Sequence, residues 1–283
     1  MKIGYLGPAG TFSWKAAEIF CRIAQVDLEL TPFKNFEEGR DMLANGGVDN
    51  VVFPIETSSA WLTDVLDLIK KLPNIFVSMG IELLTEFHLL AQRGAIKGEI
   101  KTLYSKAEAL SQCSKYTRQM GGVQCMAVSS TADAAKLAEK AGIEVAAIGP
   151  LWLTDENFSP SLVSLENIKN GRTRFLVVGN GNGCVKQLKN PDQASVFATL
   201  VHRPRSLEEV LRVVGDSNTN IARMSSWPTE DHPEYNFYLE LEWKRKSRQD
   251  WIKVIGLLSS LSAEEGGPLL KLKNLGLYPV YRA

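Results

Sequence analysis

The first half of the chain repeats one unit, in which a short apolar run and a polar turn are followed by a stretch with helical spacing of its apolar residues. The first apolar run covers residues 2–6 and precedes a helix expected over residues 14–25. Further strands are expected over residues 28–31, 51–54, 102–105, 123–128 and 145–148, with amphipathic helices between them. Strands that alternate with helices in this way predict α/β architecture with parallel strands.

The pattern changes over residues 75–94, where apolar runs lack helical spacing and predict strands that cross between two lobes. One lobe is expected over residues 1–79 and 151–185, and the second over the inserted residues 80–150. Two lobes joined by crossing strands leave a cleft between them. Such clefts are a common place for small ligands, and closure about the hinge can be part of the cycle.

The last third of the chain predicts a separate domain over residues 192–283, after a polar linker over residues 180–192. Its expected order is strand, helix, two strands, helix and a terminal strand near residues 270–275. This βαββαβ order is typical of a ferredoxin-like domain.

Composition excludes several classes of protein. The 283 residues are 45% hydrophobic and 23% charged, which suits a globular protein with two cores. Because 32 basic residues balance 32 acidic ones, no overall field attracts nucleic acid or a membrane surface. No signal peptide or membrane-spanning run is visible, so a cytoplasmic protein is expected. Cys21, Cys113, Cys125 and Cys184 lack metal-site spacing and are expected to be reduced thiols.

The segment of residues 170–175, NGRTRF, is the strongest candidate for an active-site strand. Thr173 lies between Arg172 and Arg174, so a hydroxyl that can donate a hydrogen bond stands beside two cations that can hold an anion. The structural alternative is an edge strand that carries two solvated arginines. Taken alone, this segment favours the structural alternative, and the other candidates in the chain shift the balance.

Other polar candidates follow expected strands at their carboxyl ends, where ligands of open α/β sheets bind. Thr11 lies in a glycine-containing turn before a helix, where free backbone N–H groups can bind an anion. A carboxylate and hydroxyls follow the strand at residues 51–54, and a serine and a glutamine follow the strand at residues 102–105. These side chains are Glu56, Thr57, Ser58, Ser105 and Gln112. Helix capping is the structural alternative for the hydroxyls, and a solvated helix position for Gln112.

Five motifs in order resemble the bacterial prephenate dehydratases that carry a carboxyl-terminal ACT domain, and the likeness covers nearly the whole chain. Residues 5–13 (YLGPAGTFS) are similar to the first motif of that family. Residues 54–56 (PIE) resemble its Pro-Ile-Glu-Asn motif, residues 104–113 its third motif and residues 130–132 (STA) its fourth. Residues 173–175 (TRF) resemble the motif that holds the catalytic threonine of the family.

The resemblance implies a two-lobed catalytic domain like a periplasmic binding protein, followed by a ferredoxin-like ACT domain. It implies the decarboxylating dehydration of prephenate to phenylpyruvate, in L-phenylalanine biosynthesis, without a metal or an organic cofactor. Thr173 would then assist departure of the hydroxide. The substrate would be held by residues that match the family motifs or lie beside them, namely Thr11, Glu56, Thr57, Ser58, Ser105, Gln112, Arg174 and Phe175. ACT domains commonly pair their sheets, so a homodimer or homotetramer is expected.

Several positions depart from the family pattern. Thr57 stands where the family has asparagine, Ala60 and Trp61 replace a nearby glycine, and Lys106 replaces a histidine. Pro150 interrupts the segment before Trp152. The two effector-binding elements of the ACT domain are also altered, and they align here with Leu207 and its neighbours and with Ser225, Ser226, Trp227 and Pro228. The altered elements predict little response to phenylalanine.

Two alternatives remain open at the level of the sequence. Thr57, Trp61 and Trp152 are compatible with a relative that decarboxylates prephenate without making an aromatic ring, or with one that acts on arogenate. A different class is a non-catalytic ACT-type amino-acid sensor. The joint presence of Thr173, Ser105 and Gln112 favours an enzyme, because a sensor has no use for a threonine at the leaving group.

Overall fold

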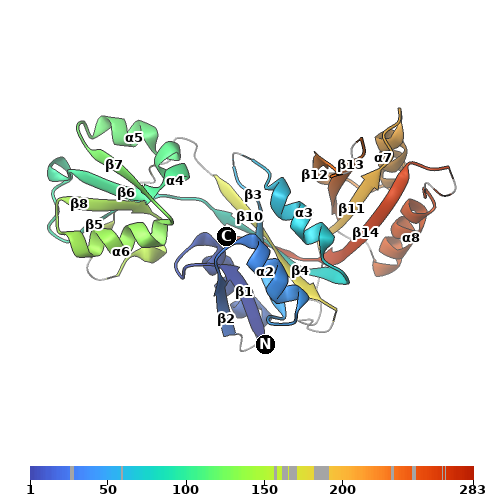
Figure 1. The fold of residues 1–283 in the computed structure, drawn as a ribbon, viewed down its shortest axis with the longest axis horizontal. Helices are drawn as coiled ribbons and strands as arrows, with labels where there is room; N and C mark the ends of the chain where they lie inside the picture. Colours follow the sequence, from blue (N-terminus) through green and yellow to red (C-terminus); the bar gives the residue numbers. More distant parts are fainter. Residues whose placement is uncertain are drawn as a thin grey trace.

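The computed structural model describes the chain except for residues 26–28, 59, 156–157, 161–164, 166–170, 182–190, 231–232, 244–246, 263 and 265. Cys184, Leu28, Asn170 and most of the expected linker therefore lie outside the described residues. Figure 1 shows three bodies in a row, with the first lobe between the second lobe and the carboxyl-terminal domain. No helix in the described part of the chain combines the length and apolarity needed to cross a membrane.

Lobe 1 is built on a mixed sheet whose strand order is β15-β4-β10-β3-β1-β2. The strands are β1 (Lys2–Leu6), β2 (Glu29–Phe33), β3 (Asn50–Glu56), β4 (Ile75–Leu84), β10 (Arg172–Asn180) and β15 (Val280–Arg282). β1 pairs in parallel with β2 and β3, whereas β10 runs antiparallel to both β3 and β4. The helices of this lobe are α1 (Phe12–Ala24), α2 (Phe36–Ala44) and α3 (Thr63–Lys71).

Lobe 2 is built on a second sheet, whose strand order is β7-β6-β8-β5-β9. The strands are β5 (His88–Gln92), β6 (Thr102–Lys106), β7 (Gln124–Val128), β8 (Val145–Gly149) and β9 (Phe158–Pro160). The helices are α4 (Ala107–Gln112), α5 (Ser114–Gln119) and α6 (Thr131–Ala141), with short 3₁₀ turns η1 (Lys97–Glu99) and η2 (Leu151–Leu153).

The boundaries between the lobes differ from those expected. β4 pairs with β10 as far as Leu84, so the crossing to lobe 2 begins near residue 85 rather than 80. β9 pairs with β5, which extends the sheet of lobe 2 to Pro160 rather than 150. A continuous apolar run hides the point at which a strand changes sheets, because hydrophobicity alone does not specify the pairing partner.

The carboxyl-terminal domain has the predicted ferredoxin-like order. Its elements are β11 (Gln193–Leu200), α7 (Ser206–Asp216), β12 (Ile221–Pro228), β13 (Tyr235–Glu242), α8 (Arg248–Ser259) and β14 (Leu269–Tyr278). The four strands form an antiparallel sheet with the order β12-β13-β11-β14. α7 and α8 cover one face of this sheet, where Trp243 and Trp251 pack edge to face.

The opposite face of the ACT sheet packs on lobe 1. Phe197, Trp227, Tyr238 and Tyr278 belong to the same buried cluster as residues of β3, β10 and α3. The end of the chain returns to lobe 1, where β15 pairs in parallel with β4 (Figure 1). The last residues of the predicted carboxyl-terminal domain are therefore an edge strand of the lobe 1 sheet, and the two domains share one core.

Candidate active site

A cavity of about 440 Å³ lies between the two lobes. Lobe 1 contributes the loop between β1 and α1, the end of β3 and the start of β10, and lobe 2 contributes the starts of α4 and α6. The lining residues are Leu6, Gly7, Thr11, Phe12, Ser13, Phe36, Pro54, Thr57, Ser58, Ala60, Leu62, Thr85, Phe87, Lys106, Glu108, Ala109, Gln112, Ser129, Ser130, Thr131, Thr173 and Phe175.

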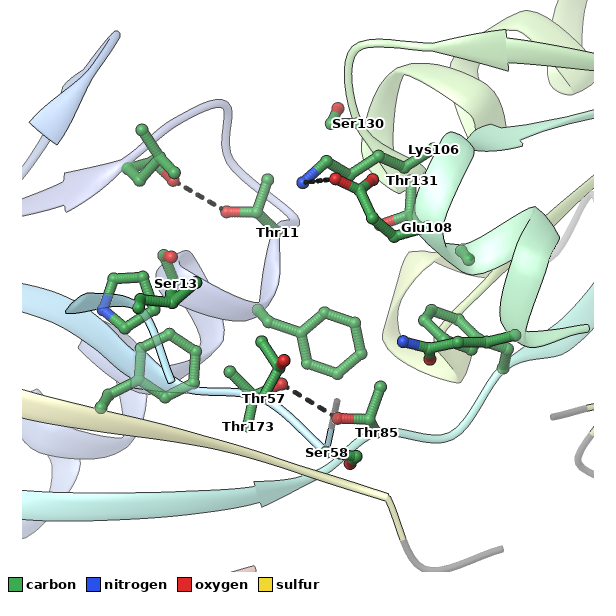
Figure 2. Close-up of a pocket in the computed structure, with 18 of the residues that line it drawn as sticks. Thr11, Ser13, Thr57, Ser58, Thr85, Lys106, Glu108, Ser130, Thr131 and Thr173 are labelled. Carbon is green, nitrogen blue, oxygen red and sulfur yellow. Dashed lines mark hydrogen bonds and ion pairs between the residues drawn. The ribbon is translucent and has the colours of Figure 1, made fainter. Parts of the chain in front are cut away.

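Thr173 and Thr85 form a pair of hydroxyls in this cavity. Their Oγ1 atoms are 3.0 Å apart, and either can be the donor (Figure 2). Thr85 follows β4 and is buried, with 8% of its surface exposed, and its backbone N–H donates to the carbonyl of Gly171 at 2.7 Å. When Thr85 donates to Thr173, the hydroxyl proton of Thr173 is available to a ligand.

Thr11 lines the cavity, but its hydroxyl serves the backbone. The Oγ1 atom accepts from the N–H of Trp14 at 3.2 Å and lies 3.0 Å from the carbonyl oxygens of both Leu6 and Pro8. Thr11 is thus the N-cap of α1. The amino end of α1 therefore faces the cavity at this position, and its first-turn N–H groups lack partners within the helix.

A second helix begins at the cavity from the side of lobe 2. Ser130 is the N-cap of α6 and accepts from the N–H of Asp133 at 3.0 Å. The hydroxyls of Ser129 and Ser130 donate to Oδ2 of Asp133, at 2.5 and 2.7 Å. The hydrogen bond from Ser129, with that from Ser130, lowers the pKa of Asp133. The amino ends of α1 and α6 both favour an anion in the space between the lobes.

Lys106 and Glu108 are the charged side chains that line the cavity, as far as the described residues show. The Nζ atom of Lys106 lies 3.4 Å from Oε1 of Glu108, and both side chains are more than half exposed. They stand at the junction of β6 and α4, across from the threonine pair (Figure 2). The two charges cancel, so these side chains give the cavity no net positive charge. An anion would have to be bound by individual groups, such as the N–H groups at the helix ends or the ammonium group of Lys106.

Gln112, Thr57, Ser58 and Phe175 also line the cavity, as the motifs led us to expect. Thr57 holds a turn, because its N–H donates to the carbonyl of Ala60 at 2.8 Å. Ser58 links this turn to β10, since its Oγ atom accepts from the backbone N–H of Arg172 at 2.6 Å.

Ser105 does not reach the cavity. It is fully buried in β6, and its hydroxyl donates to the carbonyl of Ile148 in β8 at 2.6 Å. Its place at a strand end led us to expect a ligand contact, but the alternation of side chains along the strand turns it into the interior of lobe 2. Lys106, the next residue, lines the cavity instead.

Arg174 and Glu56 lie on the opposite face of the lobe 1 sheet from the cavity. Arg174 is 3% exposed and contacts Glu240 at 2.5 Å, Glu82 at 3.1 Å and Glu56 at 3.5 Å. Burial opposes the charge of Arg174, but the adjacent carboxylate of Glu240 raises its pKa above the ordinary value. Because successive side chains of a strand point to opposite faces, Thr173 and Arg174 cannot serve the same site.

Two tryptophans that depart from the family pattern have different positions. Trp61 packs on Tyr238 of the ACT sheet, with ring centroids 5.9 Å apart, and is not a lining residue. Trp152 in η2 of lobe 2 donates from Nε1 to the carbonyl of Gly10 in lobe 1 at 3.0 Å, and its ring lies 4.9 Å from that of Phe12. Trp152 therefore connects the two lobes beside the cavity.

The residues aligned with the effector elements lie on two sides of the ACT domain. Leu207 packs against the core beneath α7 and α8. Ser225 and Trp227 of β12 are buried, while Ser226 and Pro228 are exposed. Trp227 faces lobe 1, where its Nε1 donates to Oδ1 of Asp67 in α3 at 3.0 Å. Trp227 therefore contributes to the interface between the domains.

Sequence reasoning missed Thr85, Glu108 and the lining residues Phe87 and Ser129. Thr85 lies in a short polar break between two apolar runs, and nothing local distinguishes it from a surface residue. Lys106 was noted only as a departure from the family pattern. No group of three or more His, Cys, Asp or Glu side chains that could hold a metal ion occurs among the described residues.

Comparison with known proteins agrees with this geometry. Residues 3–182 match the family model described as prephenate dehydratase. The chain is 29% identical over 290 residues to a prephenate dehydratase of Methanocaldococcus jannaschii, covering 98% of this chain and 97% of that protein.

Two solved structures resemble this chain over nearly its full length. The prephenate dehydratase of Staphylococcus aureus has 27% identity and a TM-score of 0.77, covering 98% of this chain and 100% of that one. The prephenate dehydratase of Arthrobacter aurescens, solved in complex with L-Phe, has 22% identity and a TM-score of 0.79, covering 99% and 90%. The motifs, the fold and the family match agree, and the chain belongs to the prephenate dehydratase family.

Proposed function

We propose that the chain is a cytoplasmic prephenate dehydratase that supplies phenylpyruvate for L-phenylalanine synthesis. The observation that carries this proposal is the pair of hydroxyls, Thr173 and Thr85, 3.0 Å apart in a cavity that faces two helix amino ends. The reaction needs both features, because a hydroxyl leaves from one end of a dianion while its carboxylates must be held.

The reaction breaks two bonds of the substrate. The bond between the ring and its carboxylate breaks, and the electron pair passes through the ring to expel the hydroxyl from the opposite carbon. That hydroxyl takes one proton and leaves as water, so prephenate and a proton yield phenylpyruvate, carbon dioxide and water. Formation of the aromatic ring drives the reaction, so the enzyme must mainly orient the substrate and assist departure of the hydroxyl.

Thr173 is the group proposed to assist that departure. A threonine hydroxyl is a weak acid, and its contribution is a directed hydrogen bond to the leaving oxygen. Thr85 donates to Thr173 in this arrangement, so that the proton of Thr173 points to the substrate. A chain of two hydroxyls also strengthens the second hydrogen bond, because each bond polarises the next.

The carboxylates are proposed to bind at the amino ends of α1 and α6 and at Lys106. First-turn N–H groups and the positive ends of the helix dipoles attract anions without placing a formal charge in the cavity. Lys106 adds a cation from lobe 2. Gln112 is proposed to donate a further hydrogen bond, which positions the ring between the lobes. Thr57, whose hydroxyl donates to the carbonyl of Ala60 at 3.3 Å, is proposed to contact the substrate from the turn that it holds.

Product identification tests this function. The purified protein is mixed with prephenate at neutral pH, and the product is identified by mass and ultraviolet absorbance against acid-converted prephenate. Phenylpyruvate is expected. A product that has lost carbon dioxide but kept its hydroxyl would establish the decarboxylase alternative, and the absence of turnover with any cyclohexadienyl substrate would favour the sensor.

Arogenate is a second candidate substrate, and Glu108 favours it. Arogenate carries an ammonium group where prephenate carries a keto group. The Lys106 and Glu108 pair offers one cation and one anion at 3.4 Å, which suits the carboxylate and ammonium of an amino acid. A carboxylate in the cavity has no favourable contact with a keto acid, since both a carbonyl oxygen and a carboxylate are acceptors.

The two substrates are compared by kcat/KM in the wild type and in the Glu108→Gln variant. If Glu108 binds the ammonium group, the variant loses about tenfold in kcat/KM for arogenate, the equivalent of one charged hydrogen bond. The value for prephenate stays the same or rises. Glu99→Gln, an exposed site in η1 of the same lobe, is the matched control. The arogenate alternative is rejected if the protein turns over prephenate but not arogenate and if kcat/KM for prephenate is the same in Glu108→Gln. The dehydratase proposal stays intact in that case.

Regulation and assembly are proposed from the ACT domain. The Arthrobacter relative was solved with L-Phe, whereas the corresponding elements of this chain contain Leu207 and residues 225–228 in altered form. We propose a weak response to phenylalanine, and a homodimer or homotetramer formed by pairing of ACT domains.

A further inference from the structure

A buried ionic cluster lies behind the active-site strand, between lobe 1 and the ACT sheet. Its centre is Arg174, whose guanidinium contacts three carboxylates: Nη2 lies 2.5 Å from Glu240, Nε 3.1 Å from Glu82 and Nη1 3.5 Å from Glu56. The side chains of Arg174, Glu82 and Glu240 are 4%, 6% and 0% exposed. Glu56 and Glu82 belong to lobe 1, while Glu240 belongs to the ACT strand β13, so one arginine joins the two domains.

A second arginine, which belongs to the ACT domain, contacts the same three carboxylates. Arg223 of β12 lies 3.3 Å from Glu56, 3.4 Å from Glu82 and 3.6 Å from Glu240. Arg282 of the terminal strand β15 adds a contact to Glu82 at 3.5 Å. Three arginines therefore contact the three carboxylates, and Arg282 also contacts Asp192 at 3.3 Å. The strands that carry the arginines and the three carboxylates come from both domains.

The ACT domain sets the position of Glu240. The hydroxyl of Tyr238 donates to its Oε2 atom at 3.1 Å, and Tyr238 itself contacts Ser195 of β11 at 3.0 Å. Gln193 of β11 accepts from Nη2 of Arg174 at 3.4 Å. Because Glu240 and Tyr238 are fully buried, a displacement of the ACT sheet would move the carboxylate and the arginine bound to it.

The backbone beside Thr173 is held differently by its two neighbouring strands. β10 keeps a regular register with β4 from Arg172 to Val177. On the β3 side the register shifts between Arg174 and Phe175, and the pairing with β3 ends at Arg174, next to Thr173. Because such a shift disrupts the hydrogen-bond ladder locally, side-chain contacts help to hold the start of β10 on this side: those of Arg174 on the opposite face and the hydrogen bond from Arg172 to Ser58.

We propose that Arg174 is a positioning residue for Thr173 and that the ACT domain, through Glu240, is part of the support of the active site. This inference rests on the proposed role of Thr173. The carboxylate of Glu240 holds the guanidinium, the guanidinium holds the start of β10, and the start of β10 sets where the Thr173 hydroxyl lies. A small displacement is sufficient to slow the reaction, since misplacement by about 1 Å can cost roughly 100-fold in rate.

The Glu240→Gln variant in the full-length protein tests the inference. The amide keeps the shape of the carboxylate but weakens its hold on Arg174. We expect kcat to fall by about tenfold or more, with KM changed less than about twofold, because the cavity itself is untouched. Glu242→Gln is the matched control: Glu242 lies on the same strand and face but is exposed, and its replacement should leave both constants within about twofold.

Arg223→Gln gives a second, milder test, because Arg223 is 30% exposed and touches the same carboxylates. Arg223→Gln should also lower kcat, by a smaller factor than Glu240→Gln. If Glu240→Gln does not fold, the result for Arg223→Gln tests the inference. Folding is checked by circular dichroism at the assay temperature. A folded variant of either kind with kcat within about twofold of the wild type would overturn the inference. If Thr173→Ala retains activity, the proposed role of Thr173 fails instead, whatever Glu240→Gln does.

Discussion

The two faces of β10 differ in almost every chemical respect. The face toward the cleft carries Thr173 and Phe175 and meets hydroxyls, amides and one partly exposed pair of charges. The opposite face carries Arg174 and meets three carboxylates and two further arginines, with Arg174, Glu82 and Glu240 buried at the centre of the group. The strand therefore separates a weakly charged cavity, the proposed reaction site, from a strongly charged cluster.

If the reaction takes place in the cavity, as we propose, charge density does not mark the reaction site in this protein. A reaction that expels hydroxide and carbon dioxide from a dianion needs directed hydrogen bonds more than it needs a strong base. The guanidinium of Arg174, by contrast, lies among three carboxylates and is buried away from the cavity, so it does not face a ligand there. The proposed chemistry lies where polar groups line the cavity, and the charges lie on the other side of the strand.

The largest effect is expected at the cleft face. Thr173→Ala removes the hydroxyl that assists the leaving group, so kcat should fall by at least about 100-fold, the usual contribution of a positioned proton donor. The unfolding free energy should stay nearly unchanged, because Thr173 is only partly buried. Steady-state kinetics with prephenate and urea unfolding measure the two quantities. Near-normal turnover would remove Thr173 from the mechanism.

On the opposite face the main effect should be on stability. Arg174→Met leaves the carboxylates of Glu56, Glu82 and Glu240 without their central cation, and breaking a buried ionic group in this way costs about 3–5 kcal/mol. Urea unfolding of the full chain measures this loss. Arg205→Met is the control, since Arg205 is exposed and pairs with Glu208 near the start of α7. A loss below about 1 kcal/mol would mean that the cluster contributes no more than a surface pair.

A smaller effect on activity is expected at Thr85. Thr85→Val keeps the shape of the side chain and removes the hydroxyl proposed to orient Thr173, so kcat should fall by about fivefold, which corresponds to the free energy of one ordinary hydrogen bond, about 1 kcal/mol. KM should change little. Thr102→Val, in β6 and away from the cavity, serves as a control. Equal activity of the two variants would show that Thr173 is oriented without Thr85.

The smallest effect is expected from phenylalanine. Because the residues at Leu207 and over residues 225–228 differ from the family elements, millimolar phenylalanine should change kcat/KM by less than about twofold, which corresponds to roughly 0.4 kcal/mol of coupling. Initial rates with and without the amino acid measure this response. Strong inhibition would indicate that the altered elements still form an effector site.

The sequence was sufficient to predict the family, the two-lobed α/β fold and the ferredoxin-like domain, and each of these is confirmed. It also led to Thr173, Thr57, Ser58, Gln112 and Phe175, which line the cavity. Their roles in the reaction remain predictions. These features could be predicted from the sequence because hydrophobic periodicity, turn residues and the order of motifs are properties of the chain itself and do not depend on tertiary packing.

Other features were decided only by the tertiary structure. Arg174, Glu56 and Ser105 belong to the motifs but face away from the cavity, because the direction of a side chain depends on strand register and on which face is covered. Thr85 meets Thr173 across 88 positions of sequence, and Glu240 meets Arg174 across 66. The motifs therefore determine which residues are present near the active site. The packing of the sheets decides which of them face the cleft and which face the carboxyl-terminal domain, because only packing brings distant strands together.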